Sequence, residues 1–359
     1  MRFVLLVLIL CSAISAAERW EMQFFHDVEG EEVRFGAIAF CSPSRGVATG
    51  VKIRRDSIRP MAVVTSNAGK VWTPTEMDEV AHSLFFFDET SGWMLTESGI
   101  WFTDECGRSW RRIHKQRGLV DIHFVSRERG WAVGANKTAI QTSDGGKTWT
   151  KVQAVVDLDL TADRTTFHAV AFLSPQSGII VGRSARRPDN RLPLWLDPEP
   201  QSRRERPALS VVLQTRDGGA TWATDKVSMF GRISQVQFAP SGRGLALVEF
   251  DDFFEFPSEL HAMNGAKAAD FNSLRRKDFA ITNIAAGPVF YAAGFTPPGR
   301  IFRGPVPGKV RIARSVDLAT WVEGEVDYRA VARRVLLGRS GDALWAATDT
   351  GMILNLVRD

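Results

Sequence analysis

The stretch TSDGGKTW at residues 142–149 decides the fold, because it returns along the chain. Residues 215–222, TRDGGATW, repeat it closely, and weaker copies end at Trp72 and Trp110. Each copy lies between two short apolar runs, and an Asp-Gly or Gly-Gly turn between such runs predicts a β-hairpin. In that turn the aspartate accepts backbone N–H groups, a glycine supplies a positive φ, and the tryptophan anchors the outgoing strand. One copy would indicate only a common hairpin, whereas four copies in register indicate a repeat architecture.

The spacing of the tryptophans gives the length of the repeat. Trp72 and Trp110 are 38 residues apart, and Trp110 and Trp149 are 39 residues apart. These distances fit four-stranded blades of about 40 residues. From Trp149 to Trp222 the distance is 73 residues, which is one blade plus an insertion at about 184–208.

Alternating apolar segments mark the first strand of each repeat, and seven of them predict seven blades. We therefore expect an all-β fold, a seven-bladed β-propeller of four-stranded antiparallel blades. The repeated turn decays between 250 and 275, returns at 315–321 (SVDLATW), and ends in a truncated copy at 347–351 (ATDTG). The predicted blades span residues 33–77, 81–113, 119–152, 165–227, 233–274, 280–326 and 328–359.

The last predicted blade lacks an outer strand, because the chain ends soon after the truncated copy. Residues 19–25, RWEMQFF, offer that strand, with Trp20 in the place of the repeated tryptophan. We expect this N-terminal strand to complete the seventh blade and close the ring, which removes two exposed sheet edges.

The pattern S/T-x-D-x-G-x-T-W resembles the Asp-box, or BNR repeat, of β-propellers. Gly-Trp strands precede two boxes, in RGWAVG at 129–134 and SGWML at 91–95, and the combination resembles the photosystem II stability/assembly factor family of bacterial and plastid propellers. The likeness is strongest over 81–152 and extends over 33–227. It implies a role in assembling or stabilising a membrane-associated complex, although Asp-box propellers also include sialidases, other glycoside hydrolases and sorting receptors. The residues that we assign to structural Asp-box positions are Asn67, Gly69, Trp72, Gly107, Trp110, Asp144, Gly146, Thr148, Trp149, Asp217, Gly219, Thr221, Trp222, Asp317 and Trp321.

The N-terminus predicts export. Residues 1–17 place a basic residue and an apolar run before Ser-Ala-Ala, the pattern of a secretory signal peptide cleaved after Ala17. The apolar run is too short to span a bilayer comfortably, and Leu10 before Cys11 argues against a lipoprotein anchor. We expect residues 18–359 to form one exported propeller without a transmembrane segment, in a periplasmic, extracellular or lumenal space.

Two cysteines, Cys41 and Cys106, lie in the predicted mature chain, each in a same-face turn of neighbouring blades. Whether the two cysteines form a disulfide stays open, because their spacing in the sequence does not fix the distance between them in space. The cysteine spacing gives no metal-site signature, and no phosphate loop or nucleophile elbow is present. We therefore expect neither a metal nor a cofactor.

Arginines gather in two loops that interrupt blades one and four. Each loop lies between the predicted second and third strands of its blade, and in a propeller such loops share one face. Two basic loops on one face predict a surface for an acidic or membrane-associated protein partner, and Trp195 adds an apolar anchor. The alternative is a solvated Pro/Arg-rich loop without a partner. The candidate partner-binding residues are Arg54, Arg55, Arg59, Arg186, Arg187, Arg191, Trp195, Arg203, Arg204 and Arg206.

Three other groups suggest chemistry less strongly. The acidic-aromatic run EFDDFFEF at 249–256 has the carboxylates of a glycosidase or cation site, but alternation alone explains it as outward carboxylates and inward phenylalanines. The two tyrosines, Tyr291 and Tyr328, have no clear glutamate partner in the sequence, which argues against a sialidase site. His123 and His168 occupy equivalent positions by sequence, and we interpret them as repeat packing rather than as a pair in the central channel.

These observations favour an exported, monomeric, non-catalytic scaffold that binds a protein partner. An exported chain with a formal net charge of only +4 is a poor match for nucleic acid. The alternative is an exported carbohydrate-active protein: a glycoside hydrolase, a sialidase-like enzyme or a lectin.

Overall fold

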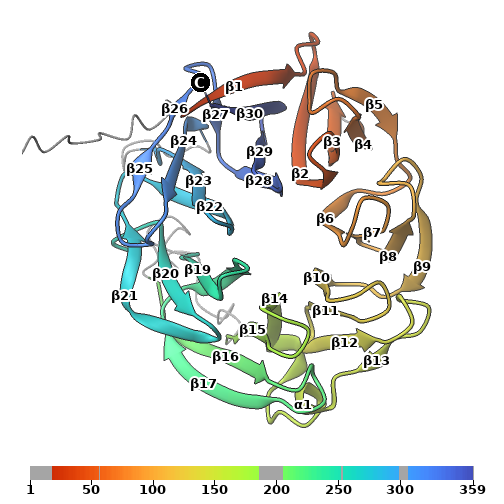
Figure 1. Ribbon diagram of the computed structural model, residues 1–359, viewed down its shortest axis with the longest axis vertical. Coiled ribbons are helices and arrows are strands. Elements are labelled where there is room, and N and C mark those ends of the chain that lie inside the picture. Colours follow the sequence, from red (N-terminus) through yellow and green to blue (C-terminus); the bar gives the residue numbers. More distant parts are fainter. Residues whose placement is uncertain (1–17, 56, 186–204, 252–253, 299–305, 359) are drawn as a thin grey trace, which may run out of the picture.

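The computed structural model describes residues 18–55, 57–185, 205–251, 254–298 and 306–358, with the backbone alone for 268–272. They form seven sheets arranged in a ring, and the sheets follow one another around it in chain order (Figure 1). The predicted seven-bladed propeller of four-stranded antiparallel blades is confirmed.

Within each blade the strands follow one another from the axis outwards (Figure 1). Blades one to three contain β2 (Glu31–Ser42), β3 (Arg45–Arg54), β4 (Ser57–Thr65) and β5 (Thr73–Glu76); β6 (Ala81–Phe86), β7 (Gly92–Thr96), β8 (Gly99–Thr103) and β9 (Arg111–Lys115); and β10 (Leu119–Phe124), β11 (Gly130–Gly134), β12 (Thr138–Thr142) and β13 (Thr150–Lys151). Blades four to six contain β14 (Thr165–Phe172), β15 (Gly178–Ser184), β16 (Ala208–Thr215) and β17 (Ala223–Met229); β18 (Arg232–Phe238), β19 (Arg243–Glu249), β20 (Ser258–Asn264) and β21 (Lys267–Arg275); and β22 (Ala280–Ala285), β23 (Phe290–Phe295), β24 (Gly308–Ser315) and β25 (Val322–Glu323). A short helix α1 (Gln153–Val156) and a 3₁₀ turn η1 (Ala162–Arg164) connect blades three and four.

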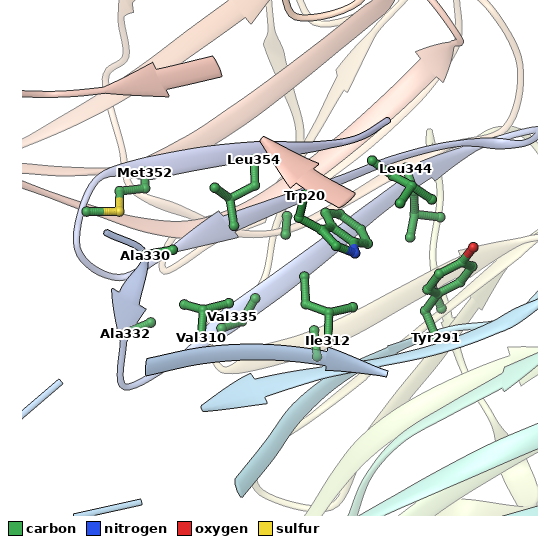
Figure 2. Close-up of a cluster of buried hydrophobic side chains, with 14 residues drawn as sticks. Trp20, Tyr291, Val310, Ile312, Ala330, Ala332, Val335, Leu344, Met352 and Leu354 are labelled. Carbon is green, nitrogen blue, oxygen red and sulfur yellow. The ribbon is translucent and has the colours of Figure 1, made fainter. Parts of the chain in front are cut away.

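The seventh blade closes the ring with the N-terminal strand, as predicted. It contains β28 (Val335–Ser340), β29 (Ala343–Thr348), β30 (Met352–Arg358) and β1 (Glu18–Phe25), with β26 (Glu325–Val326) along the outer edge of β1; β27 (Val331–Ala332) pairs with β24. β1 runs antiparallel to β30, with Trp20 opposite Leu356. Trp20 is 2% exposed and meets the Tyr291 ring edge-on, with centroids 6.2 Å apart. Figure 2 shows its indole among apolar side chains of blades six and seven, such as Ile312 and Leu344.

The truncated copy at 347–351 was wrongly interpreted as a box turn. These residues join β29 to β30, the second and third strands of the blade. A box joins the third strand to the fourth, and in blade seven that position is the junction between Arg358 and Glu18, where the ring closes.

A repeated aromatic stack explains the Gly-Trp pattern. In blade three, Phe124 at the end of the first strand stacks on Trp93 of blade two at 3.6 Å and meets the box residue Trp149 edge-on at 6.1 Å. A Cβ at Gly130 would lie 2.5 Å from the Phe124 ring, so only glycine fits opposite it. Blades one and four repeat the stack with Phe40, Trp345 and Trp72, and with Phe172, Trp131 and Trp222.

The box turn itself is held by its threonine and aspartate. Thr142 Oγ1 accepts the N–H of Gly146 at 2.9 Å, and Asp144 accepts the N–H of Thr148 at 2.9 Å and its hydroxyl at 2.6 Å. These donors lower the pKa of Asp144 to about 2. In blade one Asn67 takes the aspartate's place and its Oδ1 accepts the Val71 N–H at 2.9 Å, so an amide oxygen can also close the turn.

We expect the box aspartates to make stability acid-sensitive. The pKa values of Asp144, Asp217 and Asp317 are each about 2, below the ordinary 3.8. A lowered folded-state pKa gives stability that is present above about pH 4 and lost as the pH falls toward 2. Asp144→Asn, Asp217→Asn and Asp317→Asn together keep the acceptors, as Asn67 does, and should make the fall in melting temperature between pH 5 and 2 shallower. An equally steep fall in the triple variant would contradict this.

Candidate functional site

The propeller has two different faces, because consecutive strands in a blade run in opposite directions. One face, the box face, carries the turns between the third and fourth strands, which include residues 66–72, 104–110, 143–149 and 216–222. The other, the loop face, carries the connections between the second and third strands and those between blades, including residues 97–98, 116–118, 135–137 and 230–231. The β3–β4 hairpin with the predicted blade-one arginines lies on the loop face, and so do Ser184 and Ala208, the strand ends that flank the predicted blade-four loop.

The box face ties neighbouring blades together. Trp93 Nε1 of blade two donates to the Gly145 carbonyl in the box of blade three at 3.2 Å, and Arg129 of blade three donates to the Gly218 carbonyl in the box of blade four. Arg243 of blade five donates to the Val316 carbonyl of blade six at 2.9 Å. The sequence predicted that the boxes stabilise their own blades but did not predict these contacts between blades. The signal was the Arg-Gly dipeptide, which recurs at 45–46, 129–130 and 243–244 and supplies the donating arginines.

The disulfide that spacing left open is present. Cys41 is the last residue but one of β2 in blade one, Cys106 lies in the box turn of blade two, and their Cα atoms are 5.8 Å apart. The bond is a covalent link between neighbouring blades on the box face, beside the hydrogen bond from Arg45 of blade one to the Glu89 carbonyl of blade two at 3.0 Å.

The blade-one arginines lie on the hairpin formed by β3 and β4. Arg54, Arg55 and Arg59 are exposed. Arg59 lies directly opposite Lys52 in the strand register. Glu31 is close to two of these cations, with its carboxylate oxygens 3.9 Å from Arg54 Nε and 3.8 Å from Lys52 Nζ. The Glu31 carboxylate is therefore shared between Lys52 and Arg54, and the like charges of Lys52 and Arg59 lie opposite each other across the hairpin.

The blade-four loop is described only at its ends. β15 ends at Ser184 and β16 begins at Ala208, and Arg206 between them is exposed. The remaining predicted residues of this loop, Arg186, Arg187, Arg191, Trp195, Arg203 and Arg204, lie outside the described residues.

Two acidic residues of the run 249–256, Glu249 and Asp251, form ion pairs with arginines. Asp251 binds Arg183 at 2.6 Å and also pairs with Arg232, while Glu249 lies 3.4 Å from Arg232. Phe250 and Phe254 stack with centroids 4.1 Å apart. The carboxylates are thus bound by arginines rather than aimed at a shared open site.

The equivalence of His123 and His168 was wrong. Both first strands have a β-bulge, at Val120 in blade three and at His168 in blade four, so His168 matches Val120. His123 pairs with Trp131 and matches Ala171 of blade four. His123 lies between the rings of Phe85 and Phe172, with centroids 5.1 and 5.8 Å away. Burial lowers the pKa of His123 to about 4, so it is neutral near pH 7.

Tyr291 has a glutamate partner that the sequence did not reveal. Its hydroxyl donates to Glu18 Oε1 at 3.2 Å and accepts from Arg358 at 3.2 Å, and Arg314 lies 3.2 Å from the other Glu18 oxygen. The group resembles a tyrosine–glutamate–arginine set, but Tyr291 is 1% exposed and packs on Trp20. Glu18 begins β1 and Arg358 ends β30, so this cluster fastens the two ends of the described chain together.

Three surface pockets have cavity volumes of about 340, 400 and 640 Å³. None of the three is lined by a histidine, and Glu323, which lines two of them, pairs with Arg276 and Arg311. Across the described ranges, no group of three or more His, Cys, Asp or Glu side chains is placed to hold a metal ion. No helix in this part of the chain is long and apolar enough to cross a membrane.

Comparison with known proteins places the chain in a class. The family model for "Photosynthesis system II assembly factor YCF48" matches residues 112–186, which include a complete box and its Gly-Trp strand. The chain is a BNR-type β-propeller.

Within that class, the chain resembles the photosystem II assembly factor Ycf48. It is 24% identical over 154 residues to the photosystem II assembly lipoprotein Ycf48 of Synechocystis sp., a match that covers 38% of this chain and 44% of the relative. The Ycf48 protein of Thermosynechococcus vestitus is 24% identical over 251 residues, 66% of this chain and 68% of the relative. The chain thus spans less than half the length of the first relative.

Solved structures share the whole fold. A structure of YCF48 bound to D1 peptide has a TM-score of 0.58 at 16% identity and covers 93% of this chain and 97% of its own. Virginiamycin B lyase from Staphylococcus aureus has a TM-score of 0.57 at 9% identity and covers 95% of this chain and 100% of its own. At these identities the likeness establishes the fold and says nothing about a shared ligand.

Proposed function

We propose that this protein is a non-catalytic scaffold whose loop face binds a protein partner during assembly or stabilisation of a membrane-associated complex. The observation that carries the proposal is the blade-one hairpin, where Lys52 faces Arg59 and both Arg54 and Arg55 are exposed. Like charges directly opposite each other in a β-hairpin are destabilising. An acidic partner segment would relieve that repulsion, because charge-assisted hydrogen bonds to arginine are among the strong ones.

The comparisons support the same kind of function. A propeller of this fold holds a peptide in the structure described as YCF48 bound to D1 peptide, and the curated relatives are described as photosystem II assembly proteins. For this chain we propose a protein partner without specifying which protein it is. Its acidic character, and a monomeric propeller as the binding unit, are part of the proposal.

We also propose that the protein works outside the cytoplasm, after removal of residues 1–17. The disulfide Cys41–Cys106 supports an oxidising compartment, since such bonds persist mainly in exported proteins. A carbohydrate-active enzyme would need a carboxylate pair that converges on the sugar. Glu249 and Asp251 are instead bound by Arg183 and Arg232, which favours the scaffold.

A crosslinked pull-down from the native envelope fraction tests the proposal. We expect the triple variant Arg54→Glu, Arg55→Glu and Arg59→Glu to reduce capture by about tenfold or more, and higher salt to weaken wild-type capture. A second variant reverses four charges of the blade-four loop, at Arg186, Arg187, Arg203 and Arg204, and should also weaken capture.

The matched control reverses three exposed charges on the box face, at Lys70, Lys147 and Arg216. It should capture the partner as well as the wild type does. Capture that is equal in all variants would refute the loop face as the binding surface.

A further inference from the structure

A pocket of about 400 Å³ opens on the loop face at blade two. Its wall is formed by the end of β9, by the connection from β9 to β10, and by the turn between β7 and β8. The residues that line it are Ser98, Arg112, Lys115, Gln116 and Arg117. We call it the blade-two pocket; it is separate from the blade-one hairpin in sequence but belongs to the same face.

One wall of the blade-two pocket is held firmly. Ser98 Oγ donates to Glu79 Oε1 at 2.7 Å, and Arg112 Nη1 donates to Ser98 Oγ at 3.3 Å. The Arg112 guanidinium is 3.6 Å from the Glu79 carboxylate and lies over the Trp101 ring at 5.8 Å. Arg112 is therefore positioned before any ligand arrives, with 37% of its side chain still exposed.

Two glycines shape the backbone next to the blade-two pocket. A Cβ at Gly99 would lie 2.0 Å from the His114 carbonyl, so β8 and β9 approach closely with no side chain between them. Gly118 turns the chain with a φ of +74° directly after Arg117. This turn ends the run of cations at the pocket and sends the chain into β10.

The charge of the blade-two pocket distinguishes it from the other two. The other pockets contain carboxylates that pair with their own arginines, such as Glu323 with Arg311 at 2.9 Å. The blade-two pocket is lined by three cations and no carboxylate. In the part of the chain that the structure describes, neither Lys115 nor Arg117 forms an ion pair, and Glu79 pairs with Arg112 without lining the pocket.

We propose that the blade-two pocket binds carboxylate side chains of an acidic segment of the protein partner. The proposal rests on the proposed function and names a second contact point on the same face. Three cations line the pocket, and Glu79, which pairs with Arg112, neutralises one of them, so an excess of positive charge remains. Carboxylates accept charge-assisted hydrogen bonds from both arginine and lysine.

Fluorescence polarisation with a labelled tetraglutamate peptide tests the pocket directly. The wild-type protein should bind this peptide better than its tetraglutamine counterpart. Lys115→Glu with Arg117→Glu should weaken binding by about tenfold or more, because two charge-assisted contacts become repulsive. The control Lys70→Glu with Lys147→Glu makes the same charge change on the box face and should leave binding unchanged.

The outcomes separate this inference from the proposed function. If the box-face control lost as much peptide binding as the pocket variant, net charge alone would explain the binding, and the pocket assignment would be overturned. Peptide binding that persists in the pocket variant would also overturn the assignment. Competition by inorganic phosphate that exceeds competition by free glutamate peptide would assign the pocket to phosphate instead and also overturn it. If the pocket variant still captures the native partner while the blade-one variant does not, the inference fails and the proposed function stands.

Discussion

A chain that begins at His26 is expected to melt at least roughly 10 °C below one that begins at Glu18, because it lacks the strand that closes the ring. Removal of β1 exposes the edge of β30 and deletes Trp20 from the core between blades six and seven. The loss of a buried tryptophan side chain alone costs about 3–5 kcal/mol. The deletion also leaves Arg358 and Arg314 without the Glu18 carboxylate, which is 9% exposed.

Thermal unfolding followed by circular dichroism measures this effect. The chain that begins at Glu18 is the control, since it retains every described residue. Trp20→Ala in that chain should give an intermediate loss. A synthetic peptide of residues 18–25 added to the shorter chain should restore part of the melting temperature. Equal heat resistance of the two chains would show that the ring does not depend on this closure.

The fold was predictable because its signals are local. Each box supplies its own turn chemistry within eight residues, as Thr142, Asp144 and Gly146 show. Strand alternation and the spacing of the tryptophans then give the blade count. Even the closure followed from a local observation, that one outer strand was missing and that Trp20 lay in a suitable strand at the other end of the chain.

Contacts between blades could not be predicted in the same way. Tyr291 and Glu18 are 273 residues apart, and no local pattern indicates that they meet. His123 and His168 were wrongly matched, because the residues that the two strands share are Phe124 and Phe172, opposite Gly130 and Gly178, rather than the histidines. The carbonyls of the box turns accept hydrogen bonds from neighbouring blades because the closed ring brings the blades together.

The candidate site was predictable only in part, because the exposure of each basic side chain and its ion pairs decide whether it can bind a partner. Arg54, Arg55 and Arg59 are exposed as expected. The blade-two pocket was missed, although RRIHKQR at 111–117 places five basic residues, counting His114, in seven positions. In a β-strand side chains alternate between faces, so the sequence alone could not show that Arg112, Lys115 and Arg117 line one pocket.

Removal of the disulfide should destabilise the propeller by about 4 kcal/mol, from the loop entropy of a 65-residue separation between Cys41 and Cys106. The bond matters because it fastens the first blade to the second on the box face, where the other links between these blades are hydrogen bonds such as that of Arg45. Cys41→Ala with Cys106→Ala, in a chain that begins at Glu18, should unfold at lower denaturant concentration than the oxidised protein.

Reduction of the wild-type protein should reproduce the loss seen in the double variant, and the reductant should have no effect on that variant. Thiol labelling under denaturing conditions measures the bond itself: the oxidised protein that begins at Glu18 should release no thiol before reduction and two afterwards. Two free thiols in the untreated protein would contradict the pairing. Because neither cysteine takes part in the loop face, the reduced protein should still bind the tetraglutamate peptide wherever it stays folded, which separates the stability of the ring from recognition.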